Sequence, residues 1–312
     1  MGVCLSRIVI SEFMDERAVS QLAALHDVLY DPALVDDMPR LLAEARIAGA
    51  LVVRNRTQVR GELLAALTRC KVVGRLGVGL DNIDLPGCET RGMQVISASG
   101  ANALGVAEYV IASAMLLLRG AFTSTADVAA GKWPRLALGN GRETAGKTLG
   151  IIGFGSIGQL TARLAQGLGM RVIAFDALLQ TDAPVFRQTG VQCVALHELV
   201  SGSDVVSLHV PLVDTTRGLF DAARVAAMKA GAILINTSRG HIVDIQAVAN
   251  ALRLGHLGGA AIDVFDNEPL AASAALVDCP NLLLTPHISG VSAESNERVS
   301  FMIADKVLES LR

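Results

Sequence analysis

The sequence predicts an α/β protein in which helices flank parallel β-sheets. In the second half of the chain, short apolar runs alternate with segments of helical spacing, a pattern typical of β-α-β units and a doubly wound sheet. The N-terminal part repeats this alternation independently. Hydrophobic residues make up 51% of the 312 residues and charged residues 18%, which is typical of a chain that buries a large core. We therefore expect two domains, each built on a parallel sheet flanked by helices.

The N-terminal part contains predicted strands and helices in alternation. The predicted strands are residues 7–10, 50–53 and 72–75, and the predicted helices are residues 16–26 and 61–68. Gly77 and Gly79 indicate a turn after the third strand. No phosphate-binding glycine pattern occurs in this part.

A long apolar helix is expected over residues 104–119, and a regular alternation begins at Thr148. The predicted strands are residues 148–152, 171–175, 205–208, 232–235, 260–264 and 282–284, and the predicted helices are residues 156–168, 221–228 and 244–254. A final amphipathic helix begins near Ala293.

Composition argues against several classes of partner and compartment. The net charge is −3 and no block of like charges occurs, so we expect neither nucleic acid nor a membrane as a partner. The longest apolar stretch, residues 109–118, is too short to span a bilayer, and no secretory signal is evident. The five cysteines are dispersed, which argues against disulfides and a metal site and favours a cytoplasmic protein. They are Cys4, Cys70, Cys88, Cys193 and Cys279.

Residues 153–158 fit the pattern G-x-G-x-x-G with Gly153, Gly155 and Gly158. The match follows a predicted strand and opens a predicted helix, where backbone N–H groups and the positive helix end can bind a pyrophosphate. Asp176 ends the next predicted strand, where a carboxylate can accept hydrogen bonds from ribose hydroxyls and repel a 2′-phosphate. The pattern therefore favours NAD over NADP. The alternative is a tight turn with a capping Asp.

Arg239, Glu268 and His287 follow the last three predicted strands. A guanidinium can bind a carboxylate and polarise a carbonyl, and histidine can donate a proton near neutral pH. A carboxylate behind the imidazole would orient it and favour its protonated form. Together they predict the reduction of a 2-keto acid. The alternative is a structural ion pair between Arg239 and Glu268, with His287 in an ordinary turn.

Five motifs occur in a fixed order over most of the chain. They are the turn 153–158 with Asp176, Leu-His-Val-Pro-Leu at 208–212, Asn-Thr-Ser-Arg-Gly at 236–240, Asp-Val-Phe at 263–265 leading to Glu268-Pro269, and Thr-Pro-His-Ile at 285–288. In this order they resemble the D-isomer-specific 2-hydroxy acid dehydrogenase family, specifically a short phosphoglycerate dehydrogenase-like form without a regulatory domain. The resemblance implies a Rossmann cofactor domain over residues 100–287, a catalytic domain from residues 1–99 and 288–312, and a homodimer.

The resemblance also implies functional residues. Arg239, Glu268 and His287 match the catalytic set. The cofactor residues implied are Gly153, Gly155, Ser156, Ile157, Gly158, Asp176, His209, Pro211, Thr216, Thr237 and Asp263, the last through the nicotinamide amide. Backbone N–H groups of Val78 and Gly79 match a loop that holds the substrate carboxylate. The related formate dehydrogenases have Gln in place of Glu268, which disfavours formate as a substrate. Ser289 departs from the alanine usual in the family, either as a polar contact or as one small residue for another.

The choice of acid depends on the N-terminal part. Arg54 matches the position where phosphoglycerate dehydrogenases place an arginine near the distal phosphate, and Arg56 lies close to it in the sequence. They could hold a second anionic group, so a sulfolactate or 3-phosphoglycerate dehydrogenase-like activity is an alternative to a simple 2-hydroxy acid dehydrogenase. The opposing interpretation is a pair of surface arginines or a hinge. A non-enzymatic NAD(H)-sensing protein and a phosphite-oxidising enzyme are the competing classes.

Overall fold

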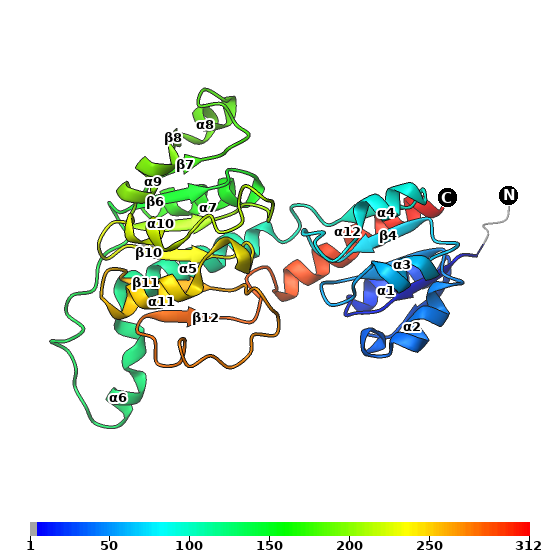
Figure 1. Ribbon diagram of the computed structural model, residues 1–312, viewed down its shortest axis with the longest axis horizontal. Helices are drawn as coiled ribbons and strands as arrows, with labels where there is room; N and C mark the ends of the chain where they lie inside the picture. Colours follow the sequence, from blue (N-terminus) through cyan, green and yellow to red (C-terminus); the bar gives the residue numbers. More distant parts are fainter. Residues whose placement is uncertain (1–4) are drawn as a thin grey trace. The chain divides into compact units, whose positions relative to one another are not determined.

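The computed structural model describes residues 5–312, which form two compact units (Figure 1). The first unit comprises the described residues up to Asn102 together with Val291–Arg312, and the second is Ala103–Gly290. Cys4 lies outside the described residues. Each unit contains one parallel sheet, so the predicted α/β class is confirmed.

The sheet of the first unit has the strand order β2-β1-β3-β4-β5, and all its pairings are parallel. Its strands are β1 (Arg7–Ile10), β2 (Asp27–Tyr30), β3 (Ala50–Val53), β4 (Val72–Arg75) and β5 (Gln94–Ser97). The three central strands are the three predicted from apolar runs. The two edge strands were not predicted, because they are partly exposed and carry polar residues where a central strand carries apolar ones.

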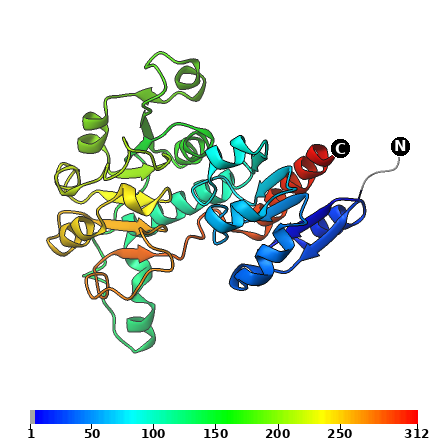
Figure 2. The ribbon, with the colours of Figure 1, turned by 45° about the vertical axis from the view of Figure 1, so that its right-hand side comes forward.

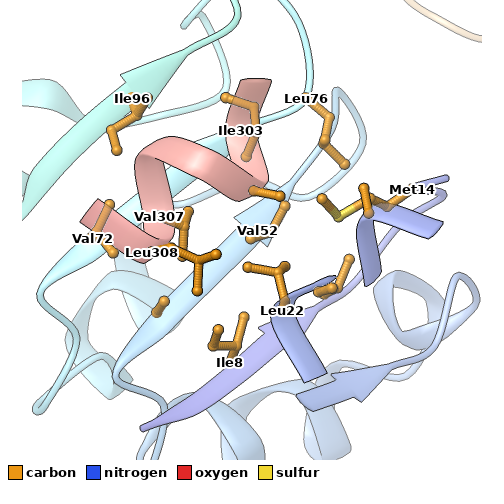
Figure 3. Packing of buried hydrophobic residues seen from close by; sticks show 14 of the residues in the cluster. Ile8, Met14, Leu22, Val52, Val72, Leu76, Ile96, Ile303, Val307 and Leu308 are labelled. Carbon is orange, nitrogen blue, oxygen red and sulfur yellow. The ribbon is translucent and has the colours of Figure 1, made fainter. Parts of the chain in front are cut away.

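The helices of the first unit include one contributed by the C-terminal end of the chain. They are α1 (Glu16–Ala23), η1 (Leu34–Asp36), α2 (Met38–Ala45), α3 (Gly61–Ala66), α4 (Leu85–Thr90) and α12 (Ala293–Leu311). Figure 3 shows Ile303 and Val307 of α12 packed among the apolar side chains of β3 and β4. An added Cβ at Gly74 would lie 2.8 Å from Ile303 Cγ2, so glycine allows α12 to approach β4 closely.

The sheet of the second unit has the order β12-β11-β10-β9-β6-β7-β8, again parallel throughout. Its strands are β6 (Thr148–Ile152), β7 (Arg171–Phe175), β8 (Gln192–Cys193), β9 (Val205–Leu208), β10 (Ile233–Asn236), β11 (Gly259–Ile262) and β12 (Leu282–Leu284). The order reverses direction between β6 and β9, and such a switch point is where open α/β sheets bind ligands, at the carboxyl ends of the strands.

The helices of the second unit cover both faces of this sheet. They are α5 (Ala103–Arg119), η2 (Ala121–Ser124), α6 (Thr125–Ala129), α7 (Ser156–Gly167), α8 (Pro184–Thr189), α9 (Leu196–Gly202), α10 (Ala222–Ala226), η3 (Gly240–Ile242) and α11 (Ile245–Arg253). Figures 1 and 2 show α6 and the loop after it extending away from the sheet. Over residues 5–312, no single helix is long and apolar enough to cross a membrane.

Candidate active site

The glycine turn joins β6 to α7, and two of its glycines are required by the packing of the chain itself. Gly153 has φ +93°, and an added Cβ would lie 2.3 Å from the carbonyl oxygen of His209. An added Cβ at Gly158 would lie 2.3 Å from the carbonyl oxygen of Gly153. Both contacts are far below van der Waals distance, so these positions let α7 and the β9 loop approach the turn closely.

Gly155 differs, because nothing in residues 5–312 requires a glycine there. Its φ is −75°, and no atom lies within 4 Å of an added Cβ. It is the N-cap of α7, where no side chain caps the helix, so N–H groups of the first turn, which begins with Ser156 and Ile157, remain for a ligand. The requirement for glycine at this open position fits a pyrophosphate that approaches the backbone closely.

Asp176 lies directly after β7 and is bonded to the turn. Its Oδ2 accepts from Phe154 N at 2.7 Å, and its Oδ1 accepts from Leu178 N at 2.9 Å. Each carboxylate oxygen retains a lone pair, so the site can still accept hydrogen bonds from ribose hydroxyls. The negative charge beside the turn fits NAD rather than a 2′-phosphate.

Two buried polar atoms after β9 and β10 have no hydrogen-bond partner within the described part of the chain. They are His209 Nδ1 and Thr237 Oγ1. Burial lowers the pKa of His209 to about 4, so the ring is neutral at working pH. Buried polar atoms without partners are costly, so these two fit a site that a bound cofactor completes. Thr216 is different, because its hydroxyl donates to Pro211 O at 2.6 Å within its own loop.

The three residues of the predicted catalytic set follow β10, β11 and β12, three neighbouring parallel strands. His287 Nδ1 lies 2.7 Å from Glu268 Oε2, and Glu268 Oε1 accepts from Phe265 N at 3.0 Å. Burial of the Glu268 carboxyl raises its pKa, but hydrogen bonds from His287 and Phe265 and the charges of His287 and Arg239 outweigh this, so the pKa lies below its usual range. The contact with Glu268 uses the imidazole Nδ1, so Nε2 lies on the other side of the ring.

Arg239 lies in the turn formed by the motif Asn-Thr-Ser-Arg-Gly at residues 236–240. Asn236 is fully buried; its Oδ1 accepts from Ser238 N at 3.0 Å and its Nδ2 donates to Arg239 O at 2.9 Å. An added Cβ at Gly240 would lie 2.1 Å from the carbonyl carbon of Phe265, so this glycine allows the loops after β10 and β11 to touch. That contact brings the Arg239 loop to the loop that carries Glu268.

His287 lies in a loop held by Asp263. The Asp263 side chain is fully buried; Oδ1 accepts from Thr285 Oγ1 at 2.5 Å and from Ile288 N at 2.9 Å, and Oδ2 accepts from Ser289 N at 2.9 Å. β11 ends one residue before Asp263, although the sequence predicted a strand through residue 264. The sequence therefore indicated Asp263 only as a cofactor contact and missed its bonds to the His287 loop.

Arg54 of the first unit lies on a loop fixed by a buried carboxylate. Glu12 is 4% exposed, and its oxygens accept from the N–H groups of Arg54 at 2.8 Å, Arg56 at 3.1 Å and Thr57 at 2.9 Å. Sequence analysis missed Glu12, because a carboxylate after an apolar strand gives no sign of being buried. These three hydrogen bonds hold the loop in place and fix the position of the Arg54 backbone.

The Arg54 and Arg56 side chains have different surroundings. Arg54 Nη2 donates to Asn296 Oδ1 at 2.8 Å, and the guanidinium lies 5.8 Å from the centre of the Phe13 ring. Burial lowers the pKa of Arg54. No carboxylate in residues 5–312 forms an ion pair with it, whereas Arg56 is paired with Asp36. Of these two arginines, Arg54 is the one whose charge is partly desolvated and not paired with a carboxylate in direct contact.

The Val78 and Gly79 loop follows β4, the neighbour of the strand that precedes Arg54. Neither N–H group donates to another residue among those described. These two donors are therefore available to an anion. In the same described region, no group of three or more His, Cys, Asp or Glu side chains could hold a metal ion.

Comparison with known proteins decides the family. Residues 111–289 match the model of the D-isomer specific 2-hydroxyacid dehydrogenase NAD binding domain. The chain belongs to the D-isomer specific 2-hydroxyacid dehydrogenase family. As a member of this family it is an oxidoreductase that acts on the CH–OH group of 2-hydroxy acids, and NAD is its cofactor. The resemblance seen in the sequence motifs is thereby confirmed.

Several members of the family are similar to this chain over nearly the whole of its length. The (S)-sulfolactate dehydrogenase of Chromohalobacter salexigens is 50% identical over 98% of this chain and 99% of its own. The D-3-phosphoglycerate dehydrogenase of Escherichia coli K12 is 37% identical over 97% of this chain and 74% of its own. The crystal structure of NAD-dependent formate dehydrogenase from Staphylococcus aureus, in complex with NAD, has a TM-score of 0.81 at 27% identity and covers 97% of this chain and 94% of its own.

Proposed function

We propose that the enzyme catalyses reversible hydride transfer between NADH and a 2-keto acid that carries a second, distal anionic group, with sulfopyruvate and sulfolactate as the substrate pair. The observation that carries this proposal is Arg54, a partly desolvated guanidinium without a carboxylate partner. The 50% identity to a sulfolactate dehydrogenase over nearly the whole chain supports the same choice. The unit that contains Arg54 is proposed as the substrate-binding domain.

The catalytic residues divide the work of reduction. When bound, NADH supplies the hydride that adds to the carbonyl carbon. Arg239 binds the carboxylate and polarises the carbonyl, since its planar cation stays charged. His287 donates a proton from Nε2 to the carbonyl oxygen as the C–O double bond becomes a C–OH group, and takes that proton back in the reverse reaction. Glu268 accepts a hydrogen bond from the imidazole Nδ1 and so holds the ring in its orientation.

The remaining substrate and cofactor contacts follow from the same chemistry. We propose that the N–H groups of Val78 and Gly79 bind the substrate carboxylate. Asp263, Thr237 and His209 are proposed to complete the cofactor site, because two of them carry buried polar atoms that await a partner. Glu268 in place of the glutamine of formate dehydrogenases supports a keto acid rather than formate.

The distal anion is proposed to bind the free side of the Arg54 guanidinium. One Nη2 hydrogen bond to Asn296 and the Phe13 ring hold the guanidinium in place while other N–H groups remain available. A charge-assisted hydrogen bond to such a group contributes about 1.5–3 kcal/mol, or roughly a ten- to hundred-fold effect on affinity. An effect of this size is large enough for the enzyme to prefer a dianionic substrate over glyoxylate.

The test is a keto acid panel run with NADH and NADPH. The panel contains glyoxylate, hydroxypyruvate, phosphohydroxypyruvate, sulfopyruvate and, for the reverse direction, sulfolactate and phosphite. We expect the highest kcat/KM with sulfopyruvate and NADH. Arg54→Gln should lower that value at least about tenfold and leave glyoxylate unchanged, whereas Arg56→Gln, the matched control, should alter neither.

Three results would contradict the proposal. Equal preference for glyoxylate and sulfopyruvate would reject the dianionic substrate, and unchanged keto acid turnover in Arg239→Ala would reject the role of the guanidinium. Tight NADH binding without turnover of any panel member would favour the NAD(H)-sensing protein instead.

We also propose a homodimer in a reducing cytoplasm. The segment from η2 through residue 138 carries large apolar side chains in solvent: Phe122 is 65% exposed, Trp133 77% and Leu136 95%. Exposed apolar groups of this size are typical of subunit interfaces. The free thiols Cys70 and Cys88 support a reducing compartment. Light scattering of Trp133→Glu, expected to be monomeric, tests the dimer.

A further inference from the structure

A chain of hydroxyl groups connects helix α5 to Asp263. Tyr109 Oη lies 2.6 Å from Thr285 Oγ1, and Thr285 Oγ1 lies 2.5 Å from Asp263 Oδ1. A carboxylate only accepts, so Thr285 donates its single proton to Asp263. Thr285 therefore accepts at its own oxygen, and Tyr109 is the donor. The hydrogen bonds run in one direction, from Tyr109 through Thr285 to Asp263.

The loop at the end of this chain contains His287. Asp263 binds it at four points: the Thr285 hydroxyl, the N–H groups of Ile288 and Ser289, and His287 N, which donates to the Asp263 carbonyl at 2.9 Å. His287 itself has φ +54°, a left-handed conformation that is unfavourable for a residue with a side chain. Such a conformation persists only where its surroundings hold it, so the direction of the imidazole depends on Asp263.

We propose that Tyr109 is a positioning residue for the proton donor His287, acting through Thr285 and Asp263. The inference rests on the proposed function, in which His287 protonates the carbonyl oxygen. Helix α5 is a suitable anchor, because its Val110 and Ala114 are buried in the same apolar core as β10 and β11. Burial raises the pKa of Tyr109 and outweighs the lowering effect of its hydrogen bond with Thr285; the charge of Asp263 raises the pKa further and a hydrogen bond with Ser113 lowers it slightly. The net pKa lies above its usual value, so the hydroxyl keeps its proton and remains a donor.

Tyr109→Phe removes the donor and leaves the ring. Because a small displacement of a reacting group can cost up to about a hundredfold in rate, we expect kcat for keto acid reduction to fall roughly five- to thirty-fold. The Kd for NADH should stay within about twofold, because no cofactor contact is removed. The solvent isotope effect on kcat should rise, because a less well-placed imidazole makes proton transfer more nearly rate-limiting.

The chain offers a matched control, because its other tyrosine is Tyr30 of the first unit. The Tyr30 hydroxyl donates to Met14 O at 3.0 Å and accepts from Met14 N at 3.4 Å, so Tyr30→Phe removes comparable hydrogen bonds. We expect it to leave kcat and the isotope effect unchanged. A loss of activity through stability alone would affect both variants alike.

A double-mutant cycle tests the route. Thr285→Ser keeps the hydroxyl and should keep activity, whereas Thr285→Val should lose as much as Tyr109→Phe or more. The double variant with Tyr109→Phe and Thr285→Val should be no worse than Thr285→Val alone, because the two side chains act in series. Wild-type kcat and isotope effect in Tyr109→Phe, or additive losses, would overturn the inference.

The His287→Asn variant distinguishes a failure of this inference from a failure of the proposed function on which it rests. If His287→Asn retains turnover, the proposed proton donor is wrong. If His287→Asn is inactive while Tyr109→Phe behaves as the wild type, only the positioning role fails.

Discussion

Replacing Gly155 with alanine separates what the glycine turn does for folding from what it does for the cofactor. The backbone there has φ −75°, which alanine adopts freely, and the added methyl group would meet no atom within 4 Å. Glycine to alanine at a compatible position stabilises by about 0.4–1 kcal/mol through the unfolded chain. Alanine is a poorer helix N-cap than glycine by a similar amount. We therefore expect Gly155→Ala to change the free energy of unfolding by less than about 1 kcal/mol.

Gly158→Ala is the matched comparison, because there the methyl group would lie 2.3 Å from the carbonyl oxygen of Gly153 and 3.1 Å from Ile151 Cγ2. The backbone must shift to relieve the first contact, and overpacking of this kind costs roughly 1–3 kcal/mol or more. We expect the two substitutions to differ clearly in urea unfolding. The comparison holds the chemical change constant and varies only the surroundings.

Gly155→Ala should have little effect on stability but a large effect on the affinity for NADH. The space beyond Gly155 is open in the protein and fits the approach of a pyrophosphate, which a methyl group would obstruct. We expect the Kd for NADH of Gly155→Ala to rise at least about tenfold, equivalent to roughly 1.4 kcal/mol. Fluorescence titration of NADH measures this. Unchanged NADH affinity, or a larger loss of stability than in Gly158→Ala, would refute the reasoning.

Three further predictions concern charged groups. Glu268→Gln removes the carboxylate that lies 2.7 Å from the imidazole of His287 and orients it, so kcat for keto acid reduction should fall at least about tenfold, and an unchanged kcat would contradict this. Asp176→Ser removes the carboxylate beside the turn, so the preference for NADH over NADPH in kcat/KM should fall at least about tenfold; an unchanged ratio would place cofactor choice elsewhere. Burial raises the pKa of Asp204, but its hydrogen bond and ion pair with Lys229 outweigh this and leave the pKa below its usual 3.8. The stabilisation of the folded state by this carboxylate is thus fully present above pH 3.8 and is lost as pH falls through the lowered pKa. Asp204→Asn should therefore reduce the free energy of unfolding by about 1 kcal/mol at pH 7 and leave it unchanged in strong acid, as measured by unfolding at several pH values. A loss of stability that does not depend on pH would contradict this.

The central strands could be predicted from the sequence because both of their faces are buried. β3, β9 and β10 are buried throughout, so each appears as a mostly apolar run, interrupted only by Ser207 in β9 and by Asn236 at the end of β10. The edge strands β2 and β8 are partly exposed and lack such a run. Their existence depends on pairing with a neighbouring strand, which no local pattern records.

In the candidate site, too, some features could be predicted from the sequence and others could not. The residues after β10, β11 and β12 could be associated in advance, because the carboxyl ends of neighbouring parallel strands meet at one edge of a sheet. The partners of Asp263 could not, because each belongs to a side chain distant in sequence or to a backbone N–H. Tyr109 and Thr285, 176 residues apart, are joined only by the packing of α5 against the sheet.

The sequence by itself determined the chemistry of this protein: a nucleotide turn, a guanidinium, a carboxylate and an imidazole in the order typical of its family. That order is local information, since each motif directly follows the strand that presents it. Only the tertiary structure decided which groups hold the reactive ones in place, among them Asp263 behind the His287 loop and Glu12 behind Arg54. The physical reason is that a hydrogen bond depends on a distance of about 3 Å between atoms, and the folded chain alone sets that distance between remote segments.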